Sequence, residues 1–235
     1  MLIIVDKPKD VTSFHIVHTC KKAFPGQKIG HGWTLDPMAT GMLIIWIWKD
    51  TKCLGDIQTG KKEYLATIDF SKMTDTWDME YRDLYQEFPV EKQDGNLWII
   101  KDWTRHKAPE KKEIESKLKW LIPEAELPLT PFSAKKKEGT RFYELARKWQ
   151  AIYENRVMKI EEIEIIDYSF PELKIIVKVW GWTYIRSIWY RIGQQFGLWW
   201  ILTALRRTAV WEYKLENLEF QTLENTNLQY AKIRE

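Results

Sequence analysis

Four segments of the chain carry apolar patterns typical of β-strands, two of them alternating and two continuous. Apolar or aromatic residues occupy every second position of residues 64–70 and of residues 173–179, with more polar residues between them. Residues 2–5 and 42–48 are continuous apolar runs, which indicate a short buried strand and a second β segment. The alternation also places Tyr64 on the apolar face of its strand, at the strand's beginning.

Helical spacing appears elsewhere along the chain. Thr12 or Ser13 can cap a helix that Pro25-Gly26 ends. Shorter helical patterns cover residues 113–121 and 140–149. The apolar face expected for the first helix consists of Phe14, Val17, Cys20 and Phe24.

A further helix is expected over residues 185–196, where isoleucine and phenylalanine recur at helical spacing and Gly197 can form the C-cap. Short strands interspersed with helices favour an α+β fold. We expect one domain over residues 1–212, with the charged residues 71–130 as a mobile insertion region. Residues 213–235 are expected to be a short C-terminal tail.

The most irregular stretch is residues 30–41, which read GHGWTLDPMATG. Glycine and proline at this density predict a loop. Asp36 lies at its middle, and a residue before proline is biased towards extended geometry, which can hold one carboxylate in a fixed direction. Asp-Pro is also a common way to begin a turn, so the pattern alone leaves both interpretations open.

Composition excludes several classes of protein. With 36 basic and 33 acidic side chains the formal net charge is +3, so any nucleic-acid surface must gather its positive charge on one face. Cys20 and Cys53 have neither a disulfide framework nor metal-ligand spacing, and the four histidines are scattered, so we expect no metal site. The apolar runs are too short for a signal peptide or a membrane span. We therefore expect a cytoplasmic protein.

Several motifs, taken in order, resemble those of the tRNA pseudouridine-55 synthases, the TruB family. The resemblance covers roughly residues 1–212 and rests on the GHxxTLDPxATG pattern of residues 30–41 and on further motifs along the chain. These are Val5-Asp6-Lys7-Pro8, Thr12-Ser13, Lys62-Glu63-Tyr64, Thr74-Asp75-Thr76, Pro131-Phe132-Ser133-Ala134-Lys135, Tyr143-Glu144-Leu145-Ala146-Arg147, Thr183-Tyr184-Ile185-Arg186-Ser187 and Ala204-Leu205-Arg206-Arg207-Thr208.

The resemblance implies a mixed, mainly antiparallel sheet flanked by helices, with an RNA-binding cleft. It implies that Asp36 is the catalytic carboxylate, that Arg186 pairs with it and that Tyr64 stacks on the target base. Whether Asp36 attacks covalently or removes a proton from the sugar stays open, because both roles use an ionised oxygen. No cofactor is implied.

The same resemblance assigns residues to RNA binding. His31 would wedge into the RNA where the flipped base had been, and Tyr184 and Leu205 would line the uridine pocket. Candidates for contacts to the RNA backbone are Lys7, Lys135, Arg147, Arg206 and Arg207.

The function implied is isomerisation of uridine-55 in the T-arm of tRNA by a monomer that needs no protein partner. The alternatives are a non-catalytic RNA-binding or tRNA-folding protein on the same scaffold, and a pseudouridine synthase with another RNA target. Many relatives carry a small C-terminal RNA-binding domain, for which about twenty residues after Trp211 leave no room.

Tryptophan is unusually frequent: the chain has 14 Trp and 11 Gly, whereas average usage would give roughly 16 Gly. Tryptophan stands at several positions where the family pattern has glycine, which is chosen for positive φ or close backbone approach. We hypothesise that UGA codons meaning glycine were translated as tryptophan; the alternative is a Trp-rich surface for stacking bases. The positions are Trp33, Trp48, Trp149, Trp182, Trp199 and Trp211.

Overall fold

Internal contacts divide the computed structural model into two compact units. Unit 1 comprises Met1–Leu65, Lys178–Gly181 and Ala204–Glu235, and unit 2 comprises Ala66–Val177 and Trp182–Thr203. The division therefore does not follow the boundary at residue 212 that the sequence suggested. The structure describes residues 1–47, 59–80, 86–87, 90–93, 96–101, 104–133, 135–137, 139–146, 148, 152, 154–224 and 226–234.

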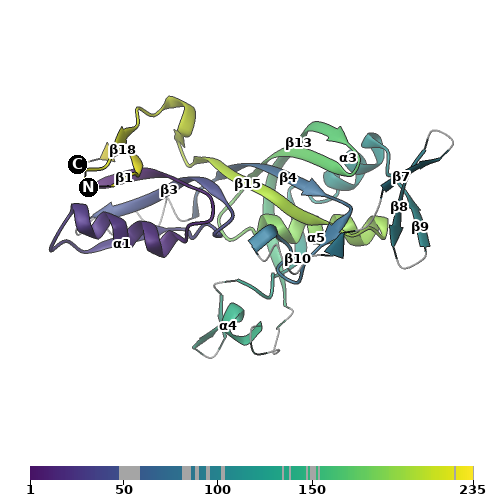
Figure 1. Cartoon of the computed structure of the whole chain (residues 1–235), viewed down its shortest axis with the longest axis horizontal. Coiled ribbons are helices and arrows are strands. Elements are labelled where there is room, and N and C mark those ends of the chain that lie inside the picture. The colour runs from purple at the N-terminus through teal and green to yellow at the C-terminus, as the bar shows by residue number, and fades with distance from the viewer. Residues whose placement is uncertain are drawn as a thin grey trace. The chain divides into compact units, whose positions relative to one another are not determined.

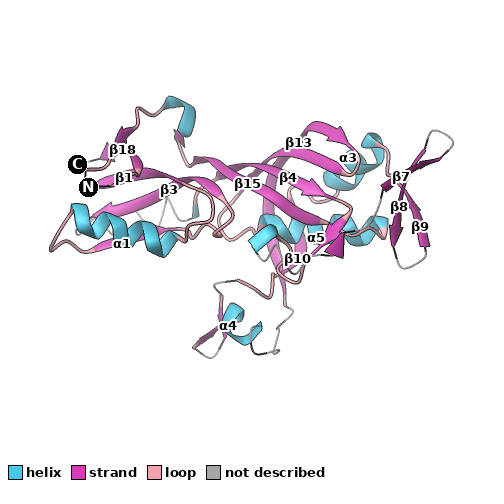
Figure 2. Ribbon diagram, viewed as in Figure 1, coloured by secondary structure: helices cyan, strands magenta, loops and turns pink. Residues whose placement is uncertain are grey.

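Unit 1 is built on a sheet whose strands run in the order β15-β3-β1-β18-β17, with β2 paired to β3 and β16 paired to β15 (Figures 1 and 2). β1 pairs antiparallel with β3 and β18, whereas β15 pairs parallel with β3. The elements with most or all of their residues here are β1 (Leu2–Lys7), α1 (Ser13–Ala23), β2 (Ile29–Gly32), β3 (Thr40–Ile47), β16 (Tyr213–Lys214), η2 (Leu215–Asn217), β17 (Gln221–Thr222) and β18 (Gln229–Arg234).

Helix α1 begins as predicted. The Thr12 hydroxyl accepts a hydrogen bond from the His15 amide at 3.0 Å, which satisfies one of the free amides of the first turn. The predicted apolar face is only partly correct. Phe14, expected on that face, is 73% exposed, and the buried side chains are Ser13, Ile16, Val17 and Cys20. The reason is that Ser13 faces inwards to bind the loop after β2.

The described residues after 212, predicted as a short C-terminal tail, pack onto unit 1. Tyr213, Leu215, Leu218 and Phe220 pack, with Trp46, against the core side chains Leu2, Ile4, Met42, Ile44 and Val210. β18 then pairs with β1, and β17 pairs with β18. No local pattern predicts this pairing, because β1 and β18 lie at opposite ends of the chain.

Unit 2 contains a sheet in the order β10-β13-β14-β4-β15 and a three-stranded meander β7-β8-β9. β4 (Lys62–Asp69), β14 (Glu172–Val179) and β15 (Ile201–Val210) contribute residues to both units. The other elements are β5 (Lys72–Met73), β6 (Gln86–Glu87), β7 (Val90–Gln93), β8 (Asn96–Lys101), β9 (Thr104–Lys107), α3 (Lys111–Lys119), β10 (Glu124–Pro128), β11 (Lys136–Lys137), β12 (Thr140–Arg141), α4 (Phe142–Ala146), β13 (Asn155–Ser169) and α5 (Ile185–Phe196).

The strongest sequence patterns of this unit are confirmed. Helix α5 covers residues 185–196 and ends at Gly197, whose φ of 63° is the left-handed C-cap expected of glycine. The alternating apolar residues of β14 are buried. α3 and α4 lie where shorter helical patterns were found, and residues 71–130 contain strands as well as α3. The α+β class is confirmed.

Tryptophan occupies most of the left-handed backbone positions that are not glycine. Five non-glycine residues of the described chain have positive φ, and four are tryptophan: Trp33 (56°), Trp77 (66°), Trp182 (69°) and Trp211 (54°). A bulky side chain in this region is a genuine outlier. Trp33, Trp182 and Trp211 were singled out in the sequence; Trp77 was not. Trp48 and Trp149 lie outside the described residues.

In the part of the chain that the structure describes, no helix is long and apolar enough to cross a membrane. Among those same residues, no group of three His, Cys, Asp or Glu side chains is arranged to hold a metal ion.

Candidate active site

The candidate catalytic aspartate lies in a loop of residues 33–39 that joins β2 to β3 in unit 1. The irregular stretch is therefore shorter than predicted, because its first residues pair with β3: His31 lies opposite Ile45, and Gly32 opposite Ile44. Within the loop, the Ala39 amide donates to the Asp36 carbonyl at 3.0 Å, which closes a turn around Pro37. Leu35, Met38 and Ala39 are buried, and Asp36 is half-buried.

Ser13 holds the loop by two hydrogen bonds to its backbone. Its hydroxyl accepts a hydrogen bond from the Leu35 amide at 2.9 Å and donates one to the Leu35 carbonyl at 3.0 Å. Ser13 is the first residue of α1, so the helix start and the residue before Asp36 are tied together. Leu35 is itself only 2% exposed, so the carboxylate of Asp36 extends from an anchored backbone.

Lys7 is a second anchor of the loop. Its ammonium group donates to the carbonyls of Pro8 at 2.9 Å, Val11 at 2.6 Å and Pro37 at 3.0 Å, and the residue is fully buried. Burial lowers the pKa of Lys7 to about 8, although the negative charges of Asp36 and Asp10 act in the opposite direction. The ammonium donors of Lys7 are thus used within its own unit, and its predicted contact with the RNA backbone stays a prediction.

Arg207, on β15, binds the first residue of the loop and the strand β3 that follows the loop. Its guanidinium donates to the Met42 carbonyl at 2.7 Å and to the Trp33 carbonyl at 3.1 Å, and the residue is 1% exposed. β15 approaches β3 so closely that a Cβ on Gly41 would lie 2.4 Å from the Arg207 carbonyl, and Gly41 has a φ of 96°. Arg207 thus anchors the loop, and its predicted contact with RNA stays a prediction.

Further candidate residues of unit 1 gather near Arg207. Its guanidinium lies 6.0 Å from the ring centroid of Tyr64, which is 7% exposed. The pKa of His31 is lowered by burial and by the charge of Arg207, and its Nδ1 has no hydrogen-bond partner among the described residues. Leu205 lies on the same strand as Arg207 and is buried. Unit 1 therefore contains Asp36, His31, Tyr64 and Leu205.

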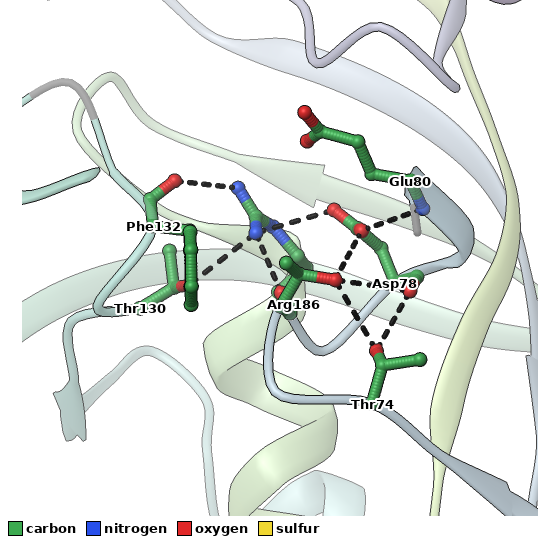
Figure 3. A network of polar contacts seen from close by, with 7 residues as sticks. Thr74, Asp78, Glu80, Thr130, Phe132 and Arg186 are labelled. Carbon is green, nitrogen blue, oxygen red and sulfur yellow. Dashed lines mark hydrogen bonds and ion pairs between the residues drawn. The ribbon is translucent and has the colours of Figure 1, made fainter. Parts of the chain in front are cut away.

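Unit 2 contains a buried polar network around Arg186 (Figure 3). Its guanidinium lies 3.2 Å from the Asp78 carboxylate, with side-chain exposures of 3% and 0%. It also donates to the Thr76 carbonyl at 2.7 Å, the Thr130 hydroxyl at 3.3 Å and the Phe132 carbonyl at 3.4 Å. Arg186 is held in one orientation by this set of oxygens.

One carboxylate oxygen of Asp78, Oδ1, is hydrogen-bonded within its own segment, and the other, Oδ2, faces Arg186. Its carboxylate accepts from the Thr76 hydroxyl at 2.9 Å and from the Glu80 amide at 3.0 Å, and the Thr74 hydroxyl donates to its carbonyl at 2.7 Å (Figure 3). Tyr184 is the half-buried N-cap residue of α5, two positions before Arg186. The pairing of Arg186 with Asp36 joins residues of different units and stays a prediction.

The other basic candidates differ in their surroundings. Arg206 makes a two-point contact with the Asp6 carboxylate, at 3.0 and 2.7 Å, and its side chain is 39% exposed. Lys135 pairs with Glu154, and this hydrogen bond is the main cause of the lowered pKa of Glu154. Arg147 lies outside the described residues.

Two residues of these networks were missed in the sequence. Asp78 carried no signal of its own, although it follows the Thr74-Asp75-Thr76 motif. Lys62 belonged to a recognised motif, but nothing in the pattern said that a lysine at the start of β4 is only 4% exposed. Burial of a charged side chain on an otherwise apolar face becomes visible only once the loop after β2 is placed beside it.

Comparison with known proteins decides the family. Residues 21–185 match the TruB family pseudouridylate synthase N-terminal domain. The chain belongs to this family. It is accordingly an isomerase, a pseudouridine synthase.

Among its relatives, a tRNA pseudouridine synthase B of Fusobacterium nucleatum is 34% identical over 92% of this chain and 69% of its own length. The protein of the same name from Flavobacterium johnsoniae is 34% identical over 97% of this chain and 96% of its own length.

Solved structures confirm the fold. The chain superposes on a protein of a Cbf5-Nop10-Gar1 complex with a TM-score of 0.63 and 24% identity, covering 91% of this chain and 50% of that one. A second match, from an H/ACA RNP bound to a substrate RNA containing 2'-deoxyuridine, has a TM-score of 0.61 and 23% identity and covers 91% of this chain and 49% of that one. The chain thus spans about half the length of the solved chains it matches.

Proposed function

We propose that this chain converts uridine-55 in the T-loop of tRNA to pseudouridine, with Asp36 as the catalytic carboxylate. The observation that carries the proposal is the anchoring of the Asp36 loop from three directions, by Ser13, Lys7 and Arg207. A carboxylate on a fixed backbone is what a reaction at one sugar carbon requires, because misplacement of a reacting group is costly. The named relatives of this chain, tRNA pseudouridine synthases, support the choice of tRNA.

The reaction is an isomerisation in which atoms balance. The bond from the sugar C1' to N1 of uracil breaks, the base turns, a bond from C1' to C5 forms, and the proton of C5 is transferred to N1 through solvent or a side chain. Asp36 either attacks C1' or removes a sugar proton; both roles need an ionised oxygen.

The other predicted residues take the roles that the family resemblance gives them. Tyr64 stacks on the target base, Leu205 and Tyr184 line its pocket, and His31 fills the space that the flipped base leaves in the RNA. The resemblance also gives Arg186 the role of partner to Asp36. The candidates for phosphate contacts remain Lys7, Lys135, Arg147, Arg206 and Arg207. We place this activity in the cytoplasm and assign it to a monomer.

The test is pseudouridine formation on an unmodified tRNA transcript without other proteins, comparing the chain with its Asp36→Asn variant. Formation at position 55 that is lost in the variant supports the proposal. Formation at another site, or only with a guide RNA and partner proteins, would replace the target. Improved tRNA folding that is unchanged by Asp36→Asn, with no pseudouridine, would favour the non-catalytic alternative.

We further propose that the natural protein carries glycine where Trp33, Trp77, Trp182 and Trp211 stand here, and also at the other family glycine positions, Trp48, Trp149 and Trp199, through UGA codons read as glycine. The positive φ of the first four supports this, because glycine alone adopts that conformation at no steric cost. A peptide mass spanning residue 33 of the protein from its own host tests it: glycine is expected, and tryptophan would refute the idea.

A further inference from the structure

Lys62 is a buried cation beside the candidate active site that the proposed mechanism does not use. Alternation along β4 places Lys62 and Tyr64 on one face of the strand, and both are buried, at 4% and 7% exposure. Glu63, between them, faces the other side and accepts a hydrogen bond from the Thr208 hydroxyl at 2.8 Å. Lysine is seldom buried in this way without a reason.

Two groups lie close to the ammonium group of Lys62, one of them from the active-site loop. It donates to the Gly60 carbonyl at 2.8 Å, and it lies 4.7 Å from the ring centroid of Trp33, the first residue of the loop. Arg207, which binds the Trp33 carbonyl, adds a second buried positive charge. Burial first, and the charge of Arg207 second, lower the pKa of Lys62 to about 7.

The indole that covers Lys62 belongs to a strained residue. Trp33 has a φ of 56°, a conformation suited to glycine. With glycine at this position the face of the ammonium group that now meets the ring would open towards the loop of Asp36. An anion placed there would interact favourably with both Lys62 and Arg207, whose mutual repulsion now opposes the charged form of Lys62.

We propose that Lys62, together with Arg207, forms an anion-binding site of the active centre that takes a phosphate group of the RNA, and that the indole of Trp33 covers this site in the chain as written. The identity of the anion as an RNA phosphate rests on the proposed function. The site itself rests on the burial of the two cations, their place beside Tyr64 and the contact of Lys62 with Trp33.

The first test uses inorganic phosphate and needs no activity. The side-chain Cε resonance of Lys62, assigned with Lys62→Met, is titrated by NMR with and without phosphate in the full chain carrying Trp33→Gly. Phosphate should raise the midpoint of Lys62 by about one pH unit. The midpoint should not move in the chain with Trp33. A folded Trp33→Gly protein whose Lys62 midpoint ignores phosphate would overturn the proposal.

The second test measures RNA. In the Trp33→Gly background, Lys62→Met should raise the KM for a tRNA transcript at least about tenfold, the value of one lost charge-assisted contact. Lys61→Met is the matched control, because Lys61 is exposed and directly precedes Lys62, just before β4, and the KM of this variant should stay unchanged. Equal KM values for the two variants would refute the RNA phosphate as ligand. A phosphate-dependent midpoint in a protein without synthase activity would keep the anion site and refute the proposed function.

Discussion

Each of the two units buries one arginine of the predicted site, and the two are neutralised differently. Arg186 of unit 2 lies against the buried carboxylate of Asp78. Arg207 of unit 1 donates to carbonyl oxygens and faces the ring of Tyr64, and it has no ion pair with any described residue. Both are almost completely inaccessible to solvent, so burial does not distinguish them.

The difference lies in where the positive charge is felt. The charge of Arg186 is met by a full negative charge within its own unit. Among the described residues Arg207 contacts only carbonyl oxygens and an aromatic ring, and its charge adds to burial, the main cause, in lowering the pKa of Lys7, of Lys62 and of His31. The charge of the buried arginine in unit 2 is therefore neutralised by a neighbouring carboxylate. Unit 1 instead keeps positive charge around the Asp36 loop, which an anionic substrate can use.

The largest expected effect on stability is at the Arg186–Asp78 pair. Asp78→Asn leaves Arg186 buried without its counter-charge and should lower the free energy of unfolding by about 3–5 kcal/mol. Denaturant titration measures this. Asp6→Asn is the control, because the Arg206–Asp6 pair is partly exposed and should change stability by less than about 1 kcal/mol. Equal effects would mean that Arg186 does not depend on Asp78.

In unit 1 the loop anchor comes next. Ser13→Ala removes both hydrogen bonds to Leu35 and leaves a buried amide and carbonyl unpaired, which should cost about 1–3 kcal/mol. It should also lower kcat, since the backbone before Asp36 loses its support. Thr19→Ala, on an accessible part of the same helix, serves as the comparison. Unchanged kcat in a destabilised Ser13→Ala protein would show that Ser13 does not position the loop.

Smaller gains are expected at the strained tryptophans. Glycine at Trp182 or Trp211 should raise the free energy of unfolding by about 0.5–1 kcal/mol, because relief of the left-handed strain exceeds the entropic cost of glycine. Trp120, 80% exposed with a φ of −70°, provides the matched control. Trp120→Gly should destabilise by a similar amount. Stabilisation at all three positions would discard backbone strain as the cause.

A pH dependence of stability is also expected in unit 1. The pKa of Lys62 is about 7 in the folded chain and 10.5 ordinarily, so between these values the unfolded chain binds the proton that the folded chain has released. The free energy of unfolding should therefore rise with pH in this window, by up to about 1.4 kcal/mol per pH unit. Lys7 acts with the same sign above about pH 8.

Lys62→Met should remove its share of this slope, and Lys61→Met should keep it. Denaturation midpoints at pH 6, 8 and 10 provide the measurement. A slope that is the same in the Lys62→Met protein and the parent would show that Lys62 is not a charged group held in a destabilising environment.

The sequence predicted what local patterns determine. The Thr12 cap, the Gly197 cap and the alternating faces of β4 and β14 each depend on neighbours a few positions apart. It failed where distant segments decide the outcome. His31 lies in a strand because β3 pairs with it, and Phe14 faces solvent because Ser13 turns inwards to Leu35.

The candidate site shows the same limit. Asp36 could be found from its motif, but the motif could not tell that Lys7 and Arg207 are buried and anchor its loop. Asp78 was invisible because its role is set by Arg186, more than a hundred residues further along the chain. Charged residues that bind the protein itself look, in sequence, like charged residues that bind a ligand.

The most direct test is pseudouridine formation on an unmodified tRNA transcript. The protein assayed carries glycine at positions 33, 48, 149, 182, 199 and 211. The protein as written and the Asp36→Ala form of the glycine protein are assayed beside it. We expect formation at uridine-55 by the glycine protein, and a loss of at least about a hundredfold on Asp36→Ala. Full activity without Asp36, or a folded glycine protein that makes no pseudouridine, would contradict the account.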